Sequence, residues 1–389
     1  MMKNKALKGV NLGGWLLMEG YILRGRNIAE HQLKRQFKRD NTGKALFEFE
    51  KEFRDNFISE DDFKNIAKLG AQIIRLPFSY RLIEEKASSR NKISFYFLDK
   101  AFKWAKDYNL KIILDLHAAC GAQNFDWHSD STGKAMLWEK ESCRKSTYRL
   151  WEIIAARYKD HSALYAYDVL NEPVLGNKSI TILKKFYKNI IKSIRGVDKK
   201  TLIYLEGSLW AQQIEFLESL IEDNVGVSIH SYLPLDYVFN FHPLLKYPGS
   251  VQNVLWNKKR LYQHFKQYHN FAFKNKVKLL VGEFGINWRG GYFGECAWLD
   301  DMLNIFDDFG FDYTYWTYKS IANDVFPSGV YQYLKNNKFV RREGPVYGWE
   351  NYSKYWKRQN KEIVSVWKTE NYTFNKSIGN ILKAHFLKK

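Results

Sequence analysis

Short apolar runs alternate with amphipathic stretches of helical period along most of the chain. Nearly every apolar run stops at polar residues, as a strand does when it is buried between layers of helices. We predict strands at residues 7–12, 72–76, 111–116, 165–170, 202–205, 225–229, 277–281 and 311–315. Eight strands interleaved with helices predict a (β/α)8 TIM barrel, an α/β fold. A doubly wound sheet is the alternative, but it would not gather polar residues at nearly every strand end.

The stretches between these strands predict the helices. The clearest begins after Ser59, a capping residue followed by three acidic residues, and ends at Gly70. The other predicted helices cover residues 97–108, a segment ending at 158, and residues 180–194, 212–221, 251–273, 296–309 and 378–386. Residues 13–57 form a long polar excursion with no predicted element. No linker divides the chain, so we expect one catalytic domain over residues 1–389, with residues 320–389 completing the barrel.

Composition and net charge limit the kinds of binding partner that we expect for the protein. A hydrophobic share of 45% with 17% aromatic residues suits a large core, and it also suits a cleft in which rings stack on sugars. The net charge of +19 raises nucleic acid as a partner. The basic residues are nevertheless scattered through helical stretches and turns, so we expect a solvated basic surface and no nucleic-acid partner.

Cysteine usage and the N-terminus bear on location. Cys120, Cys143 and Cys296 are odd in number and form no CxxC pair, which favours free thiols in a reducing compartment. No apolar signal region precedes Gly9, and no membrane span is visible. We therefore expect a cytoplasmic protein, although a secreted protein whose leader had been removed would have the same sequence. The oligomeric state stays open.

Two of the predicted strand ends carry a glutamate. The fourth strand stops at Asn171-Glu172-Pro173, and the seventh leads to Gly282-Glu283. Barrel enzymes place their chemistry at the C-terminal ends of the strands. A retaining glycosidase needs two such carboxyl groups about 5–5.5 Å apart, one as acid/base and one as nucleophile. We therefore predict that Glu172 and Glu283 meet at one end of the barrel.

Further motifs at the strand ends carry a family resemblance. In chain order they are Lys-Gly-Val-Asn-Leu-Gly-Gly-Trp at 8–15, Ile-Arg-Leu-Pro at 74–77, Asp-Leu-His at 115–117, Leu-Asn-Glu-Pro at 170–173, His-Ser-Tyr at 230–232, Gly-Glu-Phe-Gly at 282–285 and Tyr-Trp at 315–316. Together they resemble glycoside hydrolase family 5, the retaining β-glycosidases and cellulases. The opening motif, and Glu206 with Trp210, look like the branch of that family that cleaves β-1,3-glucans from the chain end.

The resemblance implies a role for each matching residue. Glu172 would be the acid/base with a raised pKa, and Glu283 the ionised nucleophile. The implied supporting residues are Arg75 as a cation that keeps a carboxylate ionised, His230 and Tyr232 as partners of Glu172 and Glu283, Asn171 as a donor to the sugar 2-hydroxyl, His117 as a second hydroxyl contact and Trp316 as the stacking floor.

Outer substrate contacts are also predicted, each with a plainer alternative. The candidates are Asn124, Trp127, His128, Glu206 and Trp288, which would otherwise be loop hydrogen-bonding groups, a helix cap or packing residues. No cofactor is expected. The nine histidines show no metal spacing, and no HExxH, GxSxG or P-loop motif is present.

We expect a β-linked glucoside or gluco-oligosaccharide as substrate, cleaved at its non-reducing end. The loops at residues 13–57, 118–131, 233–250 and 317–348 are long, and around one mouth they would turn a groove into a closed pocket. An endo-acting β-1,4-glucanase or β-mannanase is the alternative within the family. A non-catalytic barrel that binds carbohydrate or nucleic acid is the alternative outside it, but such a barrel would need neither glutamate.

Overall fold

Eight parallel strands close into a barrel in the order β1-β10-β9-β6-β5-β4-β3-β2. The computed structural model describes residues 6–83, 95–334, 342–343, 346–347, 349 and 351–388. The barrel strands are β1 (Lys8–Asn11), β2 (Ile73–Ser79), β3 (Lys111–Ala118), β4 (Leu164–Asp168), β5 (Leu202–Glu206), β6 (Val225–His230), β9 (Leu279–Phe284) and β10 (Asp312–Tyr315). The predicted (β/α)8 fold is therefore confirmed.

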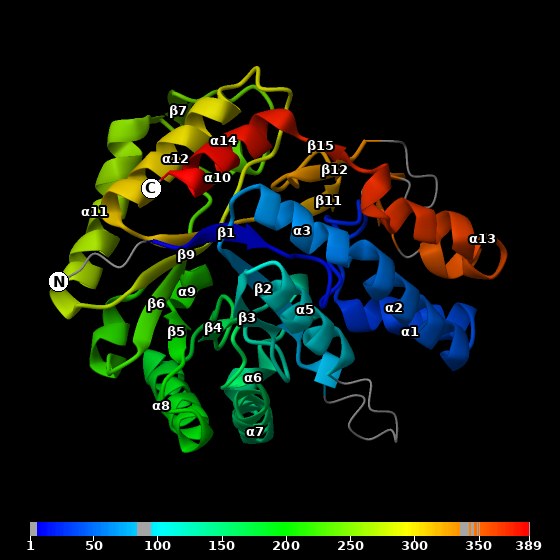
Figure 1. Ribbon diagram of the computed structural model, residues 1–389, viewed down its shortest axis with the longest axis horizontal. Helices are drawn as coiled ribbons and strands as arrows, with labels where there is room; N and C mark the ends of the chain where they lie inside the picture. The colour runs from blue at the N-terminus through cyan, green and yellow to red at the C-terminus, as the bar shows by residue number, and fades with distance from the viewer. Residues whose placement is uncertain are drawn as a thin grey trace.

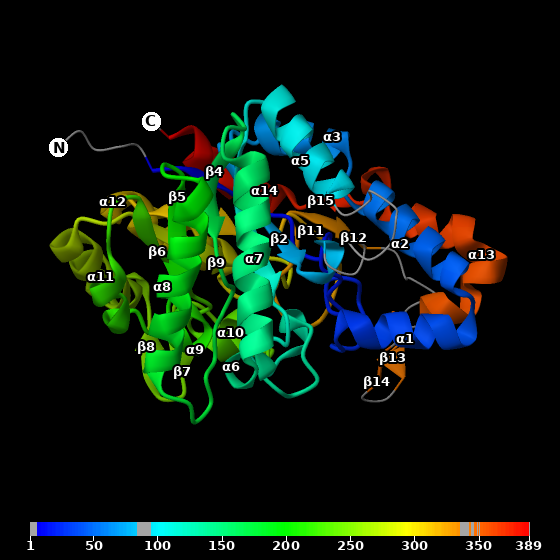
Figure 2. The same ribbon diagram turned by 90° about the horizontal axis from the view of Figure 1, so that it is seen from below.

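Helices surround the barrel (Figure 1), and short elements gather at one of its ends. The surrounding helices are α3 (Glu60–Lys68), α5 (Tyr96–Asp107), α7 (Glu141–Tyr158), α8 (Ile180–Val197), α11 (Lys258–Asn275), α12 (Glu295–Phe309) and α14 (Lys376–Leu387). At the end where the strands finish lie α6 (Met136–Glu139), α9 (Ser208–Ala211) and α10 (Leu235–Val238), away from the C-terminus (Figure 2). The loops at this end hold the functional groups.

The β2 strand continues through Pro77, where we predicted that it would stop. A proline removes one hydrogen-bond donor from a strand, so it needs a position where no partner calls for that donor. β1 pairs with β2 only as far as Arg75, whereas β3 pairs along the whole of β2 as far as Ser79. Beyond Arg75 the β1 side of β2 needs no regular ladder bond, and Pro77 is accommodated there.

The long excursion after β1 is helical over more than half its length, which the sequence analysis missed. It contains α1 (Glu30–Asp40) and α2 (Gly43–Phe57). Their buried apolar residues, such as Phe37 and Phe49, pack on Trp356 of α13 (Asn351–Trp367). These three helices stand together beside the barrel, at the right of Figure 1, and not over its mouth. The length of this loop therefore does not by itself narrow the mouth.

Two predicted helices are shorter than expected. The helix predicted at 251–273 begins only at Lys258, because a hairpin of β7 (Gly249–Val251) and β8 (Val254–Trp256) precedes it. Gln252 and Asn253 both have positive φ, which makes the two-residue turn that joins such strands. The helix predicted at 212–221 is only the 3-10 helix η2 (Glu215–Leu220), since a turn at residues 208–213 takes up the preceding chain.

The C-terminal region packs against the barrel. The remaining elements are β11 (Lys319–Ile321), β12 (Tyr331–Tyr333), β13 (Arg342–Glu343), β14 (Val346–Tyr347) and β15 (Thr373–Phe374), with the 3-10 helices η1 (Trp127–Ser129) and η3 (Thr369–Asn371). Lys319 is buried and donates to the backbone oxygens of Phe57 and Trp367 and to the Thr369 hydroxyl. One ammonium group thus joins β11, the end of α2 and the end of α13.

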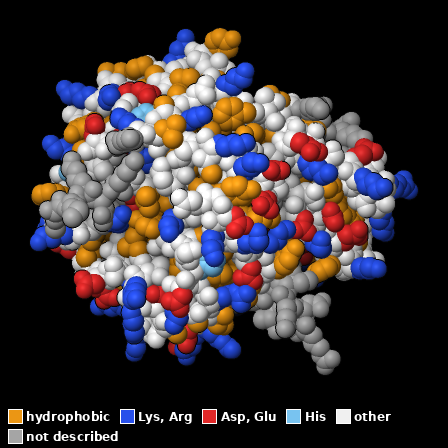
Figure 3. Space-filling view, in the orientation of Figure 1, with side chains coloured by type: hydrophobic (Ala, Val, Ile, Leu, Met, Phe, Trp, Pro, Cys, Tyr) orange, Lys and Arg blue, Asp and Glu red, His pale blue; other side chains and the backbone are white. Residues whose placement is uncertain are grey.

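The surface is charged without one dominant patch on the face shown in Figure 3. Lysine and arginine side chains are spread over that face, and acidic side chains lie between them. None of the three cysteines in the described chain, Cys120, Cys143 and Cys296, forms a disulfide. Among the described residues, no helix is both long and apolar enough to cross a membrane.

Candidate active site

Arg75 lies at the centre of the polar groups on the strand ends. Its guanidinium is fully buried and contacts Asp168 at 2.8 Å, Asp115 at 3.1 Å and Glu206 at 3.0 Å, and it also contacts Glu283. These partners raise the pKa of Arg75 well above its usual value despite its burial. Burial and the charge of Glu206 raise the pKa of Asp168 well above its ordinary range, although the contact with Arg75 opposes this shift. One permanent cation thus organises the acidic side chains of several strands.

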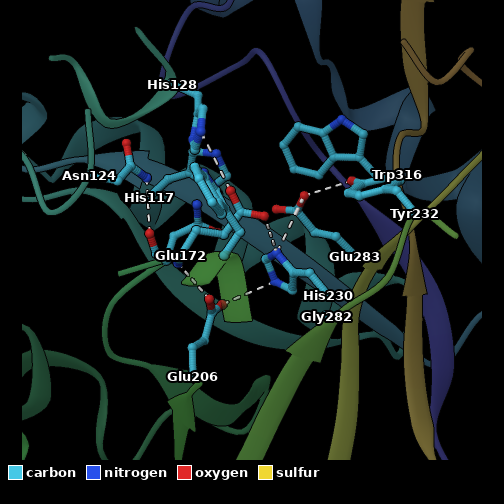
Figure 4. Close-up of polar contacts among 12 residues, drawn as sticks. His117, Asn124, His128, Glu172, Glu206, His230, Tyr232, Gly282, Glu283 and Trp316 are labelled. Atoms are coloured by element: carbon cyan, nitrogen blue, oxygen red, sulfur yellow. Dashed lines mark hydrogen bonds and ion pairs between the residues drawn. The ribbon is translucent and has the colours of Figure 1, made fainter. Parts of the chain in front are cut away.

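Glu283 is held by a hydrogen-bond donor at each carboxylate oxygen. Arg75 donates to Oε1 at 2.8 Å. The Tyr232 hydroxyl donates to Oε2 at 2.7 Å (Figure 4). Two donors from different parts of the chain thus hold the carboxyl group in one orientation. The partners that the resemblance implied for Glu283 are therefore in contact with it.

Glu172 differs, because its neighbours are histidines. The Nδ1 atom of His230 lies 2.7 Å from Glu172 Oε1, and Nε2 of His128 lies 3.5 Å from Oε2. The backbone of Glu172 is left-handed, with φ 47°, and its N–H donates to Glu206 at 2.6 Å. That backbone hydrogen bond fixes the start of the loop after β4 and with it the carboxyl group.

The expectation of a raised pKa for Glu172 is wrong for this arrangement. Burial opposes its ionisation, but the hydrogen bond and charge of His230, with the charges of His128 and His117, hold its pKa down to about 2. Burial lowers the pKa of His230, yet Glu206, Glu283 and Glu172 raise it well above its ordinary value. The proton that the pair shares therefore rests on His230, one hydrogen bond away from the Glu172 carboxylate.

The two glutamates lie close together. One oxygen of Glu172, one oxygen of Glu283 and a ring nitrogen of His230 are all within 4.8 Å of one another. Carboxyl groups in retaining glycosidases are about 5–5.5 Å apart, and those in inverting enzymes about 6.5–9.5 Å apart. Facing oxygens within 4.8 Å of each other agree with the retaining arrangement, in which the anomeric carbon lies between the two groups.

The other predicted supporting residues surround the same point. His117 stacks on Trp316 with ring centroids 5.4 Å apart, and Asp115 accepts from its Nδ1 at 2.8 Å. Asn171 accepts from Arg75 through Oδ1, and its Nδ2 has no hydrogen-bond partner among the described residues. Trp316 donates from Nε1 to the hydroxyl of Tyr21. A buried amide with an unused N–H group suits a hydrogen bond to a sugar hydroxyl.

A cavity of about 450 Å³ opens above both glutamates. Besides the predicted residues, it is lined by Glu19, Tyr21, Asp126, Trp210, Gln212, Leu233, Leu235, Phe239, His264 and Phe326. Glu19 is 2% exposed, and its Oε1 has no partner among the described residues. The sequence analysis missed Glu19, although a lone acid within the apolar stretch from Trp15 to Ile22 is a sign of a buried carboxyl group.

The outer candidates divide into two groups. Trp127 and His128 line the cavity, as predicted for substrate contacts. Asn124 is fully buried and donates to the backbone oxygen of Glu172, so it holds a loop instead. Glu206 is also fully buried, between Arg75 and His230, and is not an outer contact. Trp288 packs against the core away from the cavity lining.

This geometry agrees with the family match. Residues 37–321 match the model of the cellulase family, glycosyl hydrolase family 5. The chain belongs to glycoside hydrolase family 5. It is 25% identical over 351 residues to endoglucanase C of Acetivibrio thermocellus, which covers 82% of this chain and 92% of the relative. It is 30% identical over 333 residues to a β-xylosidase of Phanerodontia chrysosporium, covering 81% and 67%. A probable glucan 1,3-beta-glucosidase A of Aspergillus fumigatus is 29% identical over 212 residues, covering 52% and 50%.

Solved structures of family 5 share the barrel. Endoglucanase Cel5A of Thermotoga maritima superposes with a TM-score of 0.63 at 20% identity, covering 97% of this chain and 96% of that one. The named activities of the relatives include both endo and exo enzymes, so family membership establishes a glycoside hydrolase and leaves its mode of cleavage open.

One further cluster has the donor set of a cation site. Oxygens of Asp115, Asp168 and Glu206 lie within 4.8 Å of one another in this family 5 barrel. The guanidinium of Arg75 contacts all three carboxyl groups and so supplies the positive charge between them. The three carboxyl groups therefore surround the Arg75 side chain, which takes the place that a cation would have.

Proposed function

We propose that this family 5 hydrolase is exo-acting and removes a single β-linked glucosyl unit from the non-reducing end of a glucoside or short gluco-oligosaccharide. It uses Glu283 as nucleophile and Glu172 as acid/base. The exo assignment depends on the part of the cavity wall formed by Glu19 and Tyr21, which we call the sugar side. This wall ends in the buried carboxyl group of Glu19.

Glu19 and Tyr21 stand at this wall. Burial, set against the charges of His117 and His128, raises the pKa of Glu19 to about 7. A buried carboxyl oxygen without a protein partner is costly unless a ligand donates to it. Adjacent hydroxyls of a terminal sugar are such donors. A chain that continued beyond the sugar would have to displace Glu19 from its buried position.

Aromatic rings complete the wall. Phe326 packs against Tyr21 at 4.9 Å, Trp127 at 5.8 Å and Phe239 at 5.2 Å between ring centroids. These rings come from the loops after β1, β3, β6 and β10, which is where the long loops were expected to close a pocket. An extended polysaccharide needs an open groove on both sides of the cleavage point, and these rings stand across one side.

The contacts of each glutamate support its role. Glu283 is held between two donors and is placed to attack the anomeric carbon, which forms a glycosyl ester as the C–O bond to the leaving group breaks. The proton of His230 passes along the 2.7 Å hydrogen bond to Glu172 and from Glu172 to the leaving oxygen, so that Glu172 is a carboxylate and His230 a neutral imidazole once the ester has formed. Water, deprotonated by Glu172, then hydrolyses the ester and restores both groups.

Product analysis tests the mode of cleavage. The protein is incubated with cello- and laminari-oligosaccharides labelled at the reducing end, and labelled products are sized over time. We expect products shorter by one sugar and free monosaccharide from the first time point. Release of labelled fragments from internal positions, with no monosaccharide, would assign the chain to the endo-acting alternative.

A variant pair tests the wall itself. Glu19→Ala removes the carboxyl group and should lower kcat/KM for a 4-nitrophenyl β-glucoside by about 10- to 100-fold, as expected for a lost charged hydrogen bond. Glu48→Ala changes an exposed glutamate on α2 and serves as the control. Equal kcat/KM values for the two variants would mean that Glu19 does not bind the sugar.

A further inference from the structure

The side of the cavity next to Glu172 has its own lining. Given the proposed function, Glu172 protonates the leaving oxygen while Glu283 attacks from the opposite face of the sugar, so the leaving group lies on the Glu172 side. Trp210 is linked to this side through Asp126, which lies 3.6 Å from His128, and His128 lies 3.5 Å from Glu172. We therefore assign to this side the lining residues from the loops after β5 and β6 and from α11. Its lining residues are Trp210, Gln212, Leu233, Leu235 and His264. Whatever the leaving group is, the covalent geometry places it against these side chains.

This lining is mostly apolar and is exposed to solvent. Trp210 is 40% and Leu235 46% exposed, although side chains of this size are usually buried. Burial and nearby Arg260 lower the pKa of His264 to about 4, so its ring is neutral at physiological pH. Asp126 also lines the cavity, accepts from Trp210 Nε1 at 2.8 Å and lies 3.6 Å from His128.

The backbone around Trp210 and one side-chain hydrogen bond hold its ring in the cavity wall. Leu209, Trp210 and Ala211 all have positive φ, a conformation that non-glycine residues rarely adopt. Paired hydrogen bonds between the backbones of Ser208 and Gln213 close the turn. The indole N–H is tied across the mouth to Asp126 in the loop after β3. The ring is therefore held in the cavity wall, not left to move with a loop.

We propose that the leaving-group side of the active site takes an apolar aglycone, an alkyl chain or an aromatic ring, which packs on Trp210 and Leu235. A sugar in this position would bury several hydroxyl groups, and each of them needs a hydrogen-bond partner. The lining offers Gln212 and a neutral imidazole for that purpose, and the nearby Asp126 carboxylate already accepts from Trp210 through Oδ2. An alkyl or aryl group needs none, and it removes the exposed apolar surface of the wall from water.

The proposal identifies the substrate class as β-glycosides of alcohols or phenols with an apolar body. The reaction stays a hydrolysis: the glycosidic C–O bond breaks, the alcohol leaves with the proton from Glu172, and water supplies the hydroxyl of the released sugar. The inference deepens the proposed function and rests on it.

A homologous series of substrates tests the proposal. Values of kcat/KM are measured for methyl, butyl, hexyl and octyl β-glucosides, and for cellobiose and laminaribiose, in which the leaving group is glucose. Each methylene that becomes buried should raise kcat/KM about two- to fourfold until the chain outgrows the wall. The longer alkyl glucosides should then exceed both disaccharides.

Three variants locate the effect. Trp210→Ala should flatten the dependence of kcat/KM on chain length. Trp210→Phe should keep most of it, because the ring remains while the bond to Asp126 is lost. Phe273→Ala removes an apolar side chain on α11 that is 78% exposed and does not line the cavity, and it should leave the dependence unchanged.

Two results would overturn the inference. One is a flat alkyl series with faster cleavage of the disaccharides, which would show a sugar-binding subsite. The other is a chain-length dependence that survives Trp210→Ala, which would place the aglycone elsewhere. Failure to cleave any 4-nitrophenyl β-glycoside, whether glucoside or xyloside, would instead refute the proposed function, and this control separates the two.

Discussion

Replacing Glu206 by glutamine should reveal how Glu172 obtains its proton. Glu206 accepts from the Glu172 backbone N–H at 2.6 Å and lies 3.0 Å from Arg75 and 3.1 Å from His230 Nε2. Glutamine has nearly the same volume, but it carries no charge and replaces one acceptor oxygen by a donor. Glu206 touches neither the sugar nor the cleaved bond, so it acts as a positioning residue.

The amide cannot satisfy all its neighbours at once, because one oxygen of Glu206 accepts from the Glu172 N–H and the other faces both Arg75 and His230. With the amide oxygen toward the Glu172 N–H, its NH2 group faces His230 Nε2 and makes that nitrogen an acceptor, while Arg75 loses this acceptor. The proton of neutral His230 then resides on Nδ1 and points at the Glu172 carboxylate. In this tautomer His230 cannot accept from a protonated Glu172, so the acid form loses its partner.

The size of the effect follows from the lost charge. Two unit charges about 4 Å apart attract by about 4 kcal/mol at an effective dielectric constant of about 20, and this attraction now favours the imidazolium form of His230. Losing this attraction shifts the protonation equilibrium of His230 toward the neutral form by roughly a thousandfold, because about 1.4 kcal/mol is a factor of ten. General acid catalysis contributes about 10²–10⁴-fold, so a loss of about 10²–10³-fold lies within that range.

The assay compares two substrates with the same sugar. A phenyl glycoside needs a proton on its leaving oxygen, and a 4-nitrophenyl glycoside hardly does. Glu206→Gln should lower kcat/KM for the phenyl glycoside by about 10²–10³-fold and for the 4-nitrophenyl glycoside by less than about tenfold. The dependence of kcat/KM on pH should also shift for the phenyl substrate.

Asp168→Asn is the matched control, because Asp168 also contacts Arg75 in the buried cluster but is not in contact with His230 or Glu172. It should lower kcat/KM for the two substrates by similar factors. If Glu206→Gln does the same, the effect of Glu206 comes through Arg75 and the reasoning about the tautomer of His230 is refuted.

The remaining predictions concern the catalytic pair, a buried acid and a buried cation. Glu283→Gln should lower turnover of 4-nitrophenyl glycosides by at least about 10⁴-fold, whereas Glu172→Gln should show a burst of nitrophenol followed by slow turnover that azide accelerates; equal steady-state rates in both variants would contradict the assignment. The pKa of Glu19 is raised from 4.5 to about 7, so its contribution to stability is present below about pH 4.5 and lost as pH rises to about 7. The free energy of unfolding of Glu19→Gln, measured in urea, should therefore rise by up to about 3 kcal/mol relative to the parent between about pH 4.5 and 8. A difference between the two proteins that does not change with pH would refute the shift. Lys319→Ala leaves three buried acceptors unpaired and should cost about 3–5 kcal/mol in the free energy of unfolding, with Lys357→Ala on the exposed face of α13 as the control.

Much of the fold and the centre of the site could be predicted from the sequence. Strands buried on both faces are apolar throughout and end at polar residues, so the pattern marks both the strands and their ends. Since all strands of a (β/α)8 barrel run parallel, residues that follow different strands must meet at one end. This is why Glu172, Glu283 and Arg75 were expected together, although up to 208 positions separate them in the chain.

Contacts between loops could not be predicted in this way. Residues 13–57 looked like a polar loop because α1 and α2 bury one stripe against α13, whose position depends on the end of the chain. The hairpin before α11 and the turn that holds Trp210 depend on positive φ at ordinary residues, for which composition carries little signal.

The location of the proton was decided only by the tertiary structure. A sequence places a glutamate at a strand end, but its pKa depends on the charges that surround it in space. Here Glu172 lies among His230, His128 and His117, and their charges outweigh the burial that would have raised its pKa. Glu206 reaches the Glu172 backbone because β4 and β5 are neighbouring strands of the barrel. The pKa of Glu19 is raised instead, since the effect of its burial outweighs the charges of the neighbouring histidines. Electrostatic energies fall with distance and rise with burial, and both quantities exist only once the chain has folded.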